Sequence, residues 1–568
     1  MILVFGGTTE GRRAAEVLEE AGSPFFYSTK TGEQDISLHY GQRIDGAMDA
    51  EAMRSFCKEH EIRLIVDAAH PFASQLHQTI AEMALPVIRY ERIYPPRDKD
   101  ITWIDDYSQV PTDIHTLLAT TGVQSISKLK WLEERGIKVI YRILNRESSI
   151  LLAHQQGITD EHLCFYPDMA EADAILLKES GLSGGFVEKV EEARTRGMHI
   201  IAIKRPKSTQ KEPSLLCTCN GPYGLRRAVE KLLPEFYPLH SGLTTGTCAT
   251  AAAVAATRRL LYGETPKEVP VLLPDGETIS IAVGYGDDYA YCIKEAGDDP
   301  DVTNGLEIRA SVEPSKRFEI VGGEGVGRFT LPGFDFPPGE PAINKAPREM
   351  MRKNIDTDVR ITISVPQGEE IARRTFNPRL GIEGGISIIG VSGIVKPFSE
   401  EAFIDSIHKC MEVAKASGTD HVVINSGAKS ERFLKVLYPD LPSQAFVQYG
   451  NYIGETLRMA ADLQIPNVTL GVMLGKAVKL AAGNLDTHSR KTTMDKTFIK
   501  TMLNEVNCDI DISGITLARE LWDMIPQEKL NAVASNIIRH CAVYCEPLLP
   551  NGELTILLID DNGKIMKI

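Results

Sequence analysis

A glycine- and threonine-rich turn that leads into an alanine-rich segment, residues 240–261, divides the sequence into two different patterns. Apolar strands alternate with helices before it, and a strand- and glycine-rich pattern follows it. The turn predicts a helix capped by a threonine hydroxyl, with Arg258 and Arg259 at the negative end of the helix dipole. Backbone N–H groups at such a helix start can also bind an anion. A plain capped helix and an anion site therefore both remain open.

Length and charge narrow the possibilities further. A chain of 568 residues is too long for one hydrophobic core and predicts about two to four domains. The formal net charge of −15 is shared by both halves, which disfavours nucleic acid or an anionic membrane as a partner. The ten cysteines show no zinc-site spacing, and no run approaches the ~20 apolar residues of a membrane helix. With no signal peptide at the start, we expect a cytoplasmic protein with reduced thiols and no bound metal.

The first half opens with a strand, a glycine turn and a helix, the order typical of dinucleotide-binding folds. The apolar strand at residues 2–5 precedes Gly6-Gly-Thr-Thr-Glu-Gly11, and an amphipathic helix follows at residues 12–21. This spacing differs from G-x-G-x-x-G, so the turn alone is weak evidence. The second strand ends at Thr29 and Lys30, where NAD enzymes usually carry an acid. Lys30 therefore favours NADPH, although a solvated loop lysine is an equally open interpretation.

Polar residues follow a further apolar strand, residues 62–66, at Asp67 and His70. The carboxyl ends of parallel strands are where open α/β sheets bind ligands. A lone histidine is more often structural, but its position beside Asp67 favours a functional role for His70. The pattern restarts after a proline-rich connection at residues 94–97. We therefore expect two parallel-sheet α/β lobes, at about residues 1–95 and 96–236.

Several motifs in order make the first half similar to the precorrin-6A reductase family of corrin biosynthesis. The resemblance implies NADPH-dependent reduction of a tetrapyrrole double bond and agrees with two Rossmann-like lobes. The sequence does not identify the proton donor, for which His70, Lys178 and water are candidates. One departure is the turn Leu182-Ser-Gly-Gly185, where the family more often has a Gly- and Thr-containing turn. The motifs are Gly6-Gly-Thr-Thr-Glu-Gly-Arg12, Asp67-Ala-Ala-His-Pro-Phe-Ala73, Thr121-Gly122, Lys178-Glu-Ser-Gly181 and Lys204-Arg-Pro206. We expect cofactor contacts at Gly6, Gly7, Thr8, Glu10, Gly11, Arg12, Lys30, Thr121, Gly122 and Ser180.

In the second half, the opening helix is followed by a predicted hairpin around Asp275-Gly276. Residues 316–345 contain so much glycine and proline that we expect no regular secondary structure there. This stretch is either a surface loop or, through Phe334 and Phe336, a wall for a large planar ligand.

Two further stretches carry possible binding groups. Residues 383–395 predict an apolar strand between glycine turns, with Glu383 placed to hold a ribose diol. A buried strand with bends is the more common structure for such a pattern. The basic run from Lys476 to Lys491 is unusual in an acidic chain. It is either a solvated face or a binding site for carboxylates.

The second half resembles the cobalt-precorrin-5B C(1)-methyltransferase family across nearly all of residues 240–568. The resemblance implies S-adenosylmethionine as methyl donor and an α+β fold that is not the ordinary Rossmann methyltransferase. Where the family often has a histidine before Gly-Lys, this chain has Met473, to which we assign no role. The motifs are Gly242-Leu-Thr-Thr-Gly-Thr-Cys-Ala-Thr-Ala251, Pro332-Gly-Phe-Asp-Phe-Pro-Pro-Gly-Glu-Pro-Ala-Ile-Asn344, Gly384-Gly-Ile-Ser-Ile-Ile-Gly390, Gly475-Lys-Ala-Val-Lys479 and Ala482-Gly-Asn-Leu-Asp-Thr-His-Ser489. We expect cofactor contacts at Glu383, Gly384, Gly385, Ser387 and Gly390, and substrate contacts at Thr244, Thr245, Asn344, Lys345, Lys476, Lys479, Thr487, His488, Ser489 and Arg490.

The two resemblances imply consecutive steps of the anaerobic corrin route. Methylation of cobalt-precorrin-5B would give cobalt-precorrin-6A, and reduction would then give cobalt-precorrin-6B. A tethered second site raises the effective concentration of a labile intermediate. The alternatives are a chain with one active half, or a non-catalytic tetrapyrrole or nucleotide carrier. We expect a linker at residues 234–238, a small tetrapyrrole substrate and possible transient contacts with other corrin-pathway enzymes, and the oligomeric state stays open.

Overall fold

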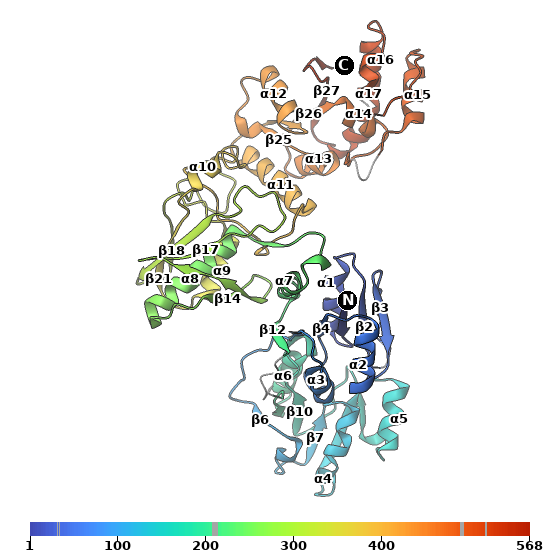
Figure 1. Ribbon diagram of the computed structural model, residues 1–568, viewed down its shortest axis with the longest axis vertical. Coiled ribbons are helices and arrows are strands. Elements are labelled where there is room, and N and C mark those ends of the chain that lie inside the picture. The colour runs from blue at the N-terminus through green and yellow to red at the C-terminus, as the bar shows by residue number, and fades with distance from the viewer. Residues whose placement is uncertain (31, 33, 207–213, 489–492, 517–519, 568) are drawn as a thin grey trace. The chain divides into compact units, whose positions relative to one another are not determined.

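The computed structural model describes the chain except for residues 31, 33, 207–213, 489–492, 517–519 and 568. The described residues form two compact units, coloured by residue number in Figure 1. Unit 1 contains residues 1–241 and 270–280, and unit 2 contains residues 242–269 and 281–568. Across these described ranges, no helix is both long and apolar enough to span a membrane.

The first sheet of unit 1 is parallel throughout, with the strand order β12-β5-β4-β1-β2-β3. Ile2 and Val4 face a core built with α1 and α7, whereas Leu3 and Phe5 face a core built with α2 and α3. Because both faces are covered, the strands are apolar on both sides. The strands are β1 (Ile2–Phe5), β2 (Phe25–Thr29), β3 (Gly41–Asp45), β4 (Leu64–Asp67), β5 (Val87–Tyr90) and β12 (Leu215–Cys219), and the helices are α1 (Thr9–Glu19), α2 (Ala50–Glu59), α3 (Ser74–Ala81) and α7 (Pro222–Leu232).

The second sheet of unit 1 is also parallel, in the order β6-β11-β10-β7-β8-β9. Helix α6 covers one face, and α4 and α5 lie on the other. The two parallel α/β lobes that the sequence predicts are therefore present. The elements are β6 (Thr102–Ile104), β7 (Thr116–Ala119), β8 (Lys138–Ile143), β9 (Leu163–Phe165), β10 (Ala174–Lys178), β11 (His199–Ile203), α4 (Lys130–Glu133), α5 (Glu147–Gln155) and α6 (Phe186–Thr195), with short 3-10 turns at Tyr107–Gln109, Val123–Lys128, Asp160–His162 and Leu182–Gly184.

The end of the first half differs from the expected lobe boundary and linker. Strand β12 pairs with β5 of the first sheet, so this part of the expected second lobe returns to the first lobe. The expected linker at residues 234–238 is not free, because Phe236 and Tyr237 are buried in the core below α1 and α7. The Tyr237 hydroxyl donates to the Val17 carbonyl over 2.8 Å. A 3-10 turn, Pro234–Phe236, leads into this packed end.

Unit 2 begins with the predicted helix, α8 (Thr245–Tyr262), which is buried along its first three turns. It packs against a mixed sheet of order β16-β17-β18-β21-β19. The stretch at residues 316–345 holds two short strands, β19 and β20, which corrects the expectation of no regular structure. The sheet strands are β16 (Gly284–Tyr285), β17 (Ala290–Ile293), β18 (Glu307–Pro314), β19 (Glu319–Gly322) and β21 (Val359–Ser364), and nearby lie β13 (Gly242–Leu243), β20 (Arg328–Phe329), β22 (Ile382–Glu383), β23 (Ile394–Val395), α9 (Lys345–Asn354) and α10 (Gly368–Ala372). The predicted hairpin forms β14 (Glu268–Leu272) and β15 (Thr278–Ala282).

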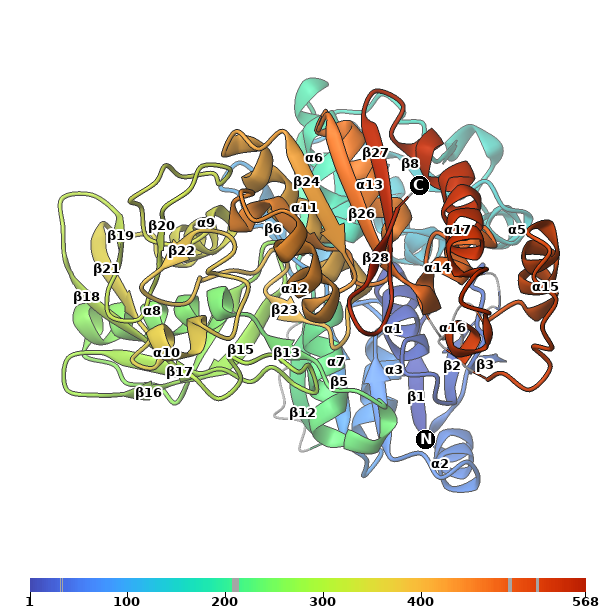
Figure 2. The same cartoon turned by 90° about the horizontal axis from the view of Figure 1, so that it is seen from above.

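The last part of unit 2 contains a second sheet of order β25-β24-β26-β27-β28. Figure 2 labels β24, β26, β27 and β28 of this sheet. Four of its strands are parallel and only β28 runs the other way. Unit 2 thus combines a mixed sheet with a parallel α/β sheet, which goes beyond the α+β expectation. The elements are β24 (His421–Asn425), β25 (Phe446–Gln448), β26 (Asn467–Met473), β27 (Glu553–Ile559), β28 (Ile565–Met566), α11 (Glu400–Ala416), α12 (Ala428–Leu437), α13 (Ile453–Asp462), α14 (Leu474–Ala481), α15 (Lys496–Glu505), α16 (Glu520–Met524) and α17 (Leu530–Cys545), with 3-10 turns at Ser443–Ala445 and Glu546–Leu548.

Candidate functional site

The two predicted catalytic residues of unit 1 are brought together at the carboxyl ends of strands from different sheets. His70 follows β4, and Lys178 ends β10. The Lys178 ammonium lies 5.3 Å from the centre of the Phe72 ring, two residues after His70. It also donates to the Thr121 carbonyl over 2.6 Å. Loops at the carboxyl ends of β4, β7 and β10 therefore meet at one site, as expected for ligand binding in α/β folds.

His70 is a neutral imidazole in this site. Burial, followed by the charges of Arg92 and Lys178, lowers its pKa to about 3. Its Nδ1 atom accepts a hydrogen bond from the Phe72 backbone N–H over 3.2 Å. The ring proton of the neutral form is therefore on Nε2. His70 can donate a hydrogen bond, but it is not an imidazolium acid at neutral pH.

Lys178 is the better acid of the pair. Burial, helped by the nearby charge of Lys128, lowers the pKa of Lys178 to about 8, so it is protonated at pH 7 yet can release its proton. Burial also lowers the pKa of Lys189, whose Nζ lies 3.3 Å from the Gly184 carbonyl. Among the described residues, the partners of these two ammonium groups are neutral carbonyl oxygens, Thr121 for Lys178 and Gly184 for Lys189. The site thus offers cations to an anionic ligand.

A polar network below His70 was not predicted from the sequence. Asp67, buried at the end of β4, contacts the ring of His77 over 2.8 Å and forms an ion pair with Arg89. His77 Nε2 lies 3.0 Å from the His70 carbonyl oxygen. Burial alone would raise the pKa of Asp67, but the His77 hydrogen bond and the Arg89 charge hold it low. His77 lies within α3, and no motif in the sequence singled it out.

The turn after β1 contains three glycines, Gly6, Gly7 and Gly11, whose surroundings differ. Gly7 has φ +81° and a Cβ there would meet no atom within 4 Å. A Cβ on Gly6 would instead lie 2.2 Å from the Tyr27 ring, and one on Gly11 would lie 2.5 Å from Gly6 Cα. The Thr8 hydroxyl accepts from the Gly11 N–H and caps α1. Gly6 and Gly11 therefore allow tight packing. Gly7 is open only on its Cβ side, because its N–H already donates to Tyr27 Oη and Gln34 Oε1.

Two residues expected to contact the cofactor are engaged inside the chain. Glu10 is buried and pairs with Arg92 over 2.9 Å, and the Ser183 hydroxyl also contacts its carboxylate. Arg92 donates to the Ser180 carbonyl over 2.8 Å. Glu10 and the Ser180 backbone thus join the two lobes. By contrast, Gly122 has φ +88° and an open Cβ position beside Thr121, whose hydroxyl lies 2.6 Å from Ser125 Oγ.

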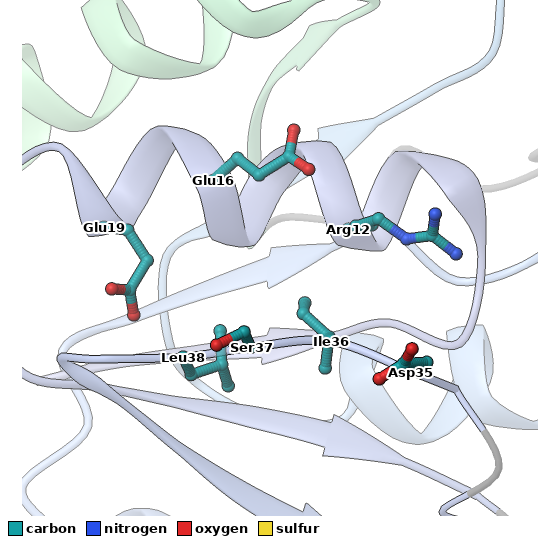
Figure 3. Close-up of a pocket in the computed structure, with 7 residues that line it drawn as sticks. All are labelled: Arg12, Glu16, Glu19, Asp35, Ile36, Ser37 and Leu38. Carbon is teal, nitrogen blue, oxygen red and sulfur yellow. The ribbon is translucent and has the colours of Figure 1, made fainter.

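A pocket of about 310 Å³ lies along α1. Figure 3 shows its lining residues, with Arg12 near the start of that helix. Three carboxylates also line it, and that of Glu19 is held by the N–H groups of Tyr40 and Gly41. This lining disfavours a pyrophosphate group, so the pocket does not support the expected role of Arg12. Besides Arg12 and Glu19, the pocket is lined by Glu16, Asp35, Ile36, Ser37 and Leu38.

Lys30 is exposed at the end of β2, where the sequence predicts a cation in place of an acid. An acid is nevertheless close, because Asp45 on β3 is the register partner of Thr29. The Thr29 hydroxyl donates to Asp45 over 2.7 Å, and Arg43 also donates to this carboxylate. These hydrogen bonds hold the pKa of Asp45 low. Asp45 is therefore occupied by its own neighbours.

In unit 2, the start of α8 is buried and bonded to residues 387–393. The Thr245 hydroxyl accepts from the Ile389 N–H over 2.9 Å, and the Gly246 N–H donates to the Ile389 carbonyl. The Thr244 hydroxyl accepts from the Thr247 N–H as the helix cap. Both hydroxyls are therefore bonded within the chain, which favours the plain capped helix. The substrate contacts predicted at Thr244 and Thr245 stay a prediction.

The predicted cofactor segment Glu383–Gly390 is close-packed backbone. A Cβ on Gly385 would lie 2.1 Å from the Gly325 carbonyl oxygen, and one on Gly390 would lie 2.3 Å from Thr244 Oγ1. The Ser387 hydroxyl is 3.2 Å from Asn377 Oδ1. Isolated bridges through residues 386 and 388 take the place of a regular strand. These glycines serve packing, and Glu383 and Gly384 remain open to solvent.

The predicted planar-ligand wall is partly used for internal packing. Phe334 stacks on Phe329 at 4.3 Å between ring centres, and the Arg348 guanidinium lies 4.1 Å from the centre of the Phe336 ring. Asn344 precedes α9, and its buried Oδ1 atom accepts no hydrogen bond from any residue that the structure describes. Lys345 is exposed, 4.0 Å from Glu349. Asn344 therefore has a free acceptor, and Lys345 is a solvated lysine.

The predicted basic cluster lies at the carboxyl end of β26. Lys476 donates to the Gly450 carbonyl, and its Nζ atom lies 5.6 Å from the centre of the Tyr449 ring. Burial and the neighbouring charge of Lys479 lower the pKa of Lys476 to about 8. Lys479 donates to the carbonyl of the buried Thr487 over 3.3 Å. His488 is half-buried beside this segment, and Ser489 and Arg490 lie outside the described residues. Among the residues that the structure describes, no group of three or more His, Cys, Asp or Glu side chains could hold a metal ion.

The chain matches three family models. Residues 1–219 match precorrin-6x reductase CbiJ/CobK, residues 234–397 match CbiD, and residues 486–567 match the CbiD C-terminal domain. Cobalt-precorrin-5B C(1)-methyltransferase of Prosthecochloris aestuarii is 42% identical over 345 residues, 56% of this chain and 94% of that protein. The Brucella anthropi protein of that name is 45% identical over 281 residues, 46% and 76% of the two chains. The crystal structure of a cobalamin biosynthesis protein from Archaeoglobus fulgidus shares 29% identity, covers 44% of this chain and 83% of that one, and has a TM-score of 0.27.

These matches and the two units define a bifunctional enzyme of cobalamin biosynthesis, with a reductase part and a methyltransferase part. The chain belongs to the cobalt-precorrin-5B C(1)-methyltransferase family and carries a precorrin-6x reductase part at its N-terminus. The resemblances found in the sequence are thereby confirmed.

Proposed function

We propose that the chain catalyses two consecutive steps of the anaerobic corrin route in the cytoplasm, where its ten free cysteines stay reduced. Residues 240–568 would methylate C-1 of cobalt-precorrin-5B with S-adenosylmethionine as donor. Residues 1–236 would reduce the resulting cobalt-precorrin-6A to cobalt-precorrin-6B with NADPH. The substrate is a small tetrapyrrole, and transient contacts with other corrin-pathway enzymes belong to the same proposal. The observation that carries it is the meeting of His70 and Lys178 at strand ends of both lobes.

For the reduction, NADPH supplies a hydride and the protein must supply a proton. Lys178, with a pKa of about 8, is the residue we assign to this proton transfer. The Nε2–H of neutral His70 orients the substrate by a hydrogen bond, since His70 stays unprotonated at pH 7. Lys189 provides a further positive charge for a substrate carboxylate. A general acid placed in this way typically contributes about 10²- to 10⁴-fold to the rate.

Two features of unit 1 support dinucleotide binding: the strand order of its first sheet and the glycine turns at the ends of its strands. The first sheet has the strand order of a doubly wound dinucleotide-binding fold, which supports our assignment of Rossmann-like lobes. The Cβ positions of Gly7 and Gly122 are open, and the exposed Lys30 can pair with a 2′-phosphate. We therefore keep Gly6, Gly7, Thr8, Gly11, Lys30, Thr121 and Gly122 as cofactor contacts, and assign Glu10, Arg12 and Ser180 to structural roles.

For the methylation, the predicted S-adenosylmethionine contacts at residues 385–390 do not fit a bound cofactor, because backbone already fills the space beside Gly385 and Gly390. We derive no step through the methyl donor there. The methyltransferase type remains non-Rossmann in our proposal. We assign Lys476 and Lys479 to the substrate carboxylates, because both stand at the carboxyl edge of a parallel sheet.

One experiment tests the two assignments together. The purified full chain is given cobalt-precorrin-5B with S-adenosylmethionine and NADPH, and each product is followed by mass spectrometry. Lys178→Met should slow NADPH consumption by about 10²- to 10⁴-fold and accumulate cobalt-precorrin-6A. Lys476→Met should slow methylation and leave the reduction of added cobalt-precorrin-6A intact. A chain that consumes neither cofactor with these substrates would contradict the proposal and favour a non-catalytic carrier.

A further inference from the structure

Residues 270–280 come from the methyltransferase half of the sequence but form part of unit 1. They form the turn of the hairpin β14–β15 and the strand residues next to it. In this turn the Leu273 N–H donates to the Glu277 carbonyl. Val271, Leu273 and Ile279 of the hairpin are buried. The same segment is flanked on both sides by residues that belong to unit 2. The chain therefore passes between the units three times, not once at the expected linker.

Glu277 connects the hairpin to helix α7. Its side chain is 1% exposed. The carboxylate accepts hydrogen bonds from the backbone N–H groups of Tyr223, over 3.0 Å, and Gly224. These two amides lie in the first turn of α7, whose own N-cap, Gly221, offers no side chain to them. Glu277 thus caps a helix that the reductase half leaves uncapped.

The helix start is shaped to admit this carboxylate. A Cβ on Gly221 would lie 2.4 Å from the carboxyl carbon of Glu277, and one on Gly224 would lie 2.7 Å from its Oε1 atom. Beside it, the Thr278 N–H donates to Asn220 Oδ1 over 2.9 Å. Helix α7 packs through Leu225 and Val229 into the core of the first sheet. The glycines, the amide of Asn220 and the acid of Glu277 are thus complementary parts of one contact.

We propose that residues 270–280 act as a clasp, a part of the reductase fold supplied by the methyltransferase half, which keeps both activities in one particle. The clasp explains why residues 234–238 need not act as a free linker. It also predicts that cutting the chain after residue 238 does not release a complete reductase unit. This inference concerns association and is independent of the catalytic roles assigned above.

The test uses the full chain with a protease recognition site inserted between Pro238 and Leu239. After cleavage under native conditions, the two pieces should co-elute in size-exclusion chromatography. Glu277→Lys, which puts a cation against the positive end of α7, should make them elute separately. Thr278→Lys, at the exposed neighbouring position that begins β15, is the matched control and should leave co-elution unchanged. Separation of the unsubstituted pieces, or co-elution with Glu277→Lys, would overturn the proposal.

A second variant covers the case in which Glu277→Lys fails to fold. Gly224→Ala places a methyl group against Glu277 Oε1 from the opposite side of the contact. In the uncut chain, hydrogen exchange at the backbone amides of positions 223 and 224 should then speed up at least tenfold, while exchange in β1 and β4 stays slow. Unchanged exchange at both amides would show that Glu277 does not hold the helix start.

Discussion

The ammonium group of Lys178 lies 5.3 Å from the centre of the Phe72 ring, although Lys178 ends β10 of one sheet and Phe72 follows β4 of the other. This contact places a lysine with a lowered pKa next to the loop that carries His70. In the proposed reduction, the lysine must be protonated to act, so its role has a definite pH signature.

We expect kcat for cobalt-precorrin-6A reduction to fall as the pH rises above about 8, because Lys178 then loses its proton. Lys178→Met should lower kcat by about 10²- to 10⁴-fold. Lys178→Arg should keep substrate binding but lower kcat, and it should remove the alkaline limb, because arginine stays protonated. The measurement is the pH dependence of NADPH oxidation from pH 6 to 10. Lys130→Met, at an exposed position of α4, is the control, and an unchanged alkaline limb in Lys178→Arg would exclude this role.

The choice between NADPH and NADH should depend on Lys30. The acid near the end of β2, Asp45, is already bonded to Thr29 and Arg43, so it is not free to hold a ribose diol. Lys30→Glu should therefore lower the ratio of kcat/KM for NADPH to that for NADH by at least about tenfold, equal to ~1.4 kcal/mol. Lys58→Glu, exposed on α2, controls for net charge. Equal ratios in Lys30→Glu and the unsubstituted enzyme would remove Lys30 from the cofactor site.

The parallel architecture of unit 1 could be predicted from the sequence, because each strand is a short apolar run followed by a polar turn. The capped start of α8 was also predictable from Thr244. The sequence did not decide between a cap and an anion site, since the answer depends on Ile389, which is distant in the chain and bonds to Thr245 and Gly246.

The parts of the site that the sequence missed depend on long-range contacts. Glu10 and Gly385 occur in motifs, but Arg92 neutralises the first and backbone at Gly325 packs against the second. Neither partner is near its motif in the sequence. His77 was missed for the same reason, because its link to Asp67 forms only when α3 folds back beside β4.

Substrate binding by unit 2 should depend on the two lysines of α14. A charge-assisted hydrogen bond to a carboxylate typically contributes ~1.5–3 kcal/mol. Lys476→Met or Lys479→Met should therefore weaken corrinoid binding about ten- to a hundredfold, with little change in affinity for S-adenosylmethionine. The sequence makes the same prediction for Arg490→Ala, a position outside the described residues. Titration calorimetry with each ligand separately is the measurement, and Lys500→Met on α15 is the control. An equal loss for both ligands would indicate a packing role.

The stability of unit 1 should fall as the pH rises through the range in which Glu277 ionises. Burial, together with the charge of Asp275, raises the pKa of Glu277 from 4.5 to about 7, although the Gly224 and Tyr223 amides oppose this shift. Between pH 4.5 and about pH 7, Glu277 is therefore protonated in the folded state and ionised in the unfolded state. Lowering the pH through this range favours the folded state. Tyr90 and Cys219, whose pKa values are also raised by burial, stay neutral throughout. The pKa shift of Glu277 contributes about 3 kcal/mol to the free energy of unfolding. This contribution is present below pH 4.5 and lost above pH 7.

Glu277→Gln removes this ionisation and keeps an acceptor oxygen for the first turn of α7. We therefore expect the melting temperature of unit 1 to be higher in Glu277→Gln than in the unsubstituted chain at pH 8, and nearly equal at pH 5. Differential scanning calorimetry of the full chain at several pH values between 5 and 8 measures both. The comparison of the two proteins at each pH cancels the contributions of other titrating groups, which both share. A constant difference in melting temperature across this range would show that Glu277 keeps an ordinary pKa, and that its carboxylate caps α7 in the charged form at every pH.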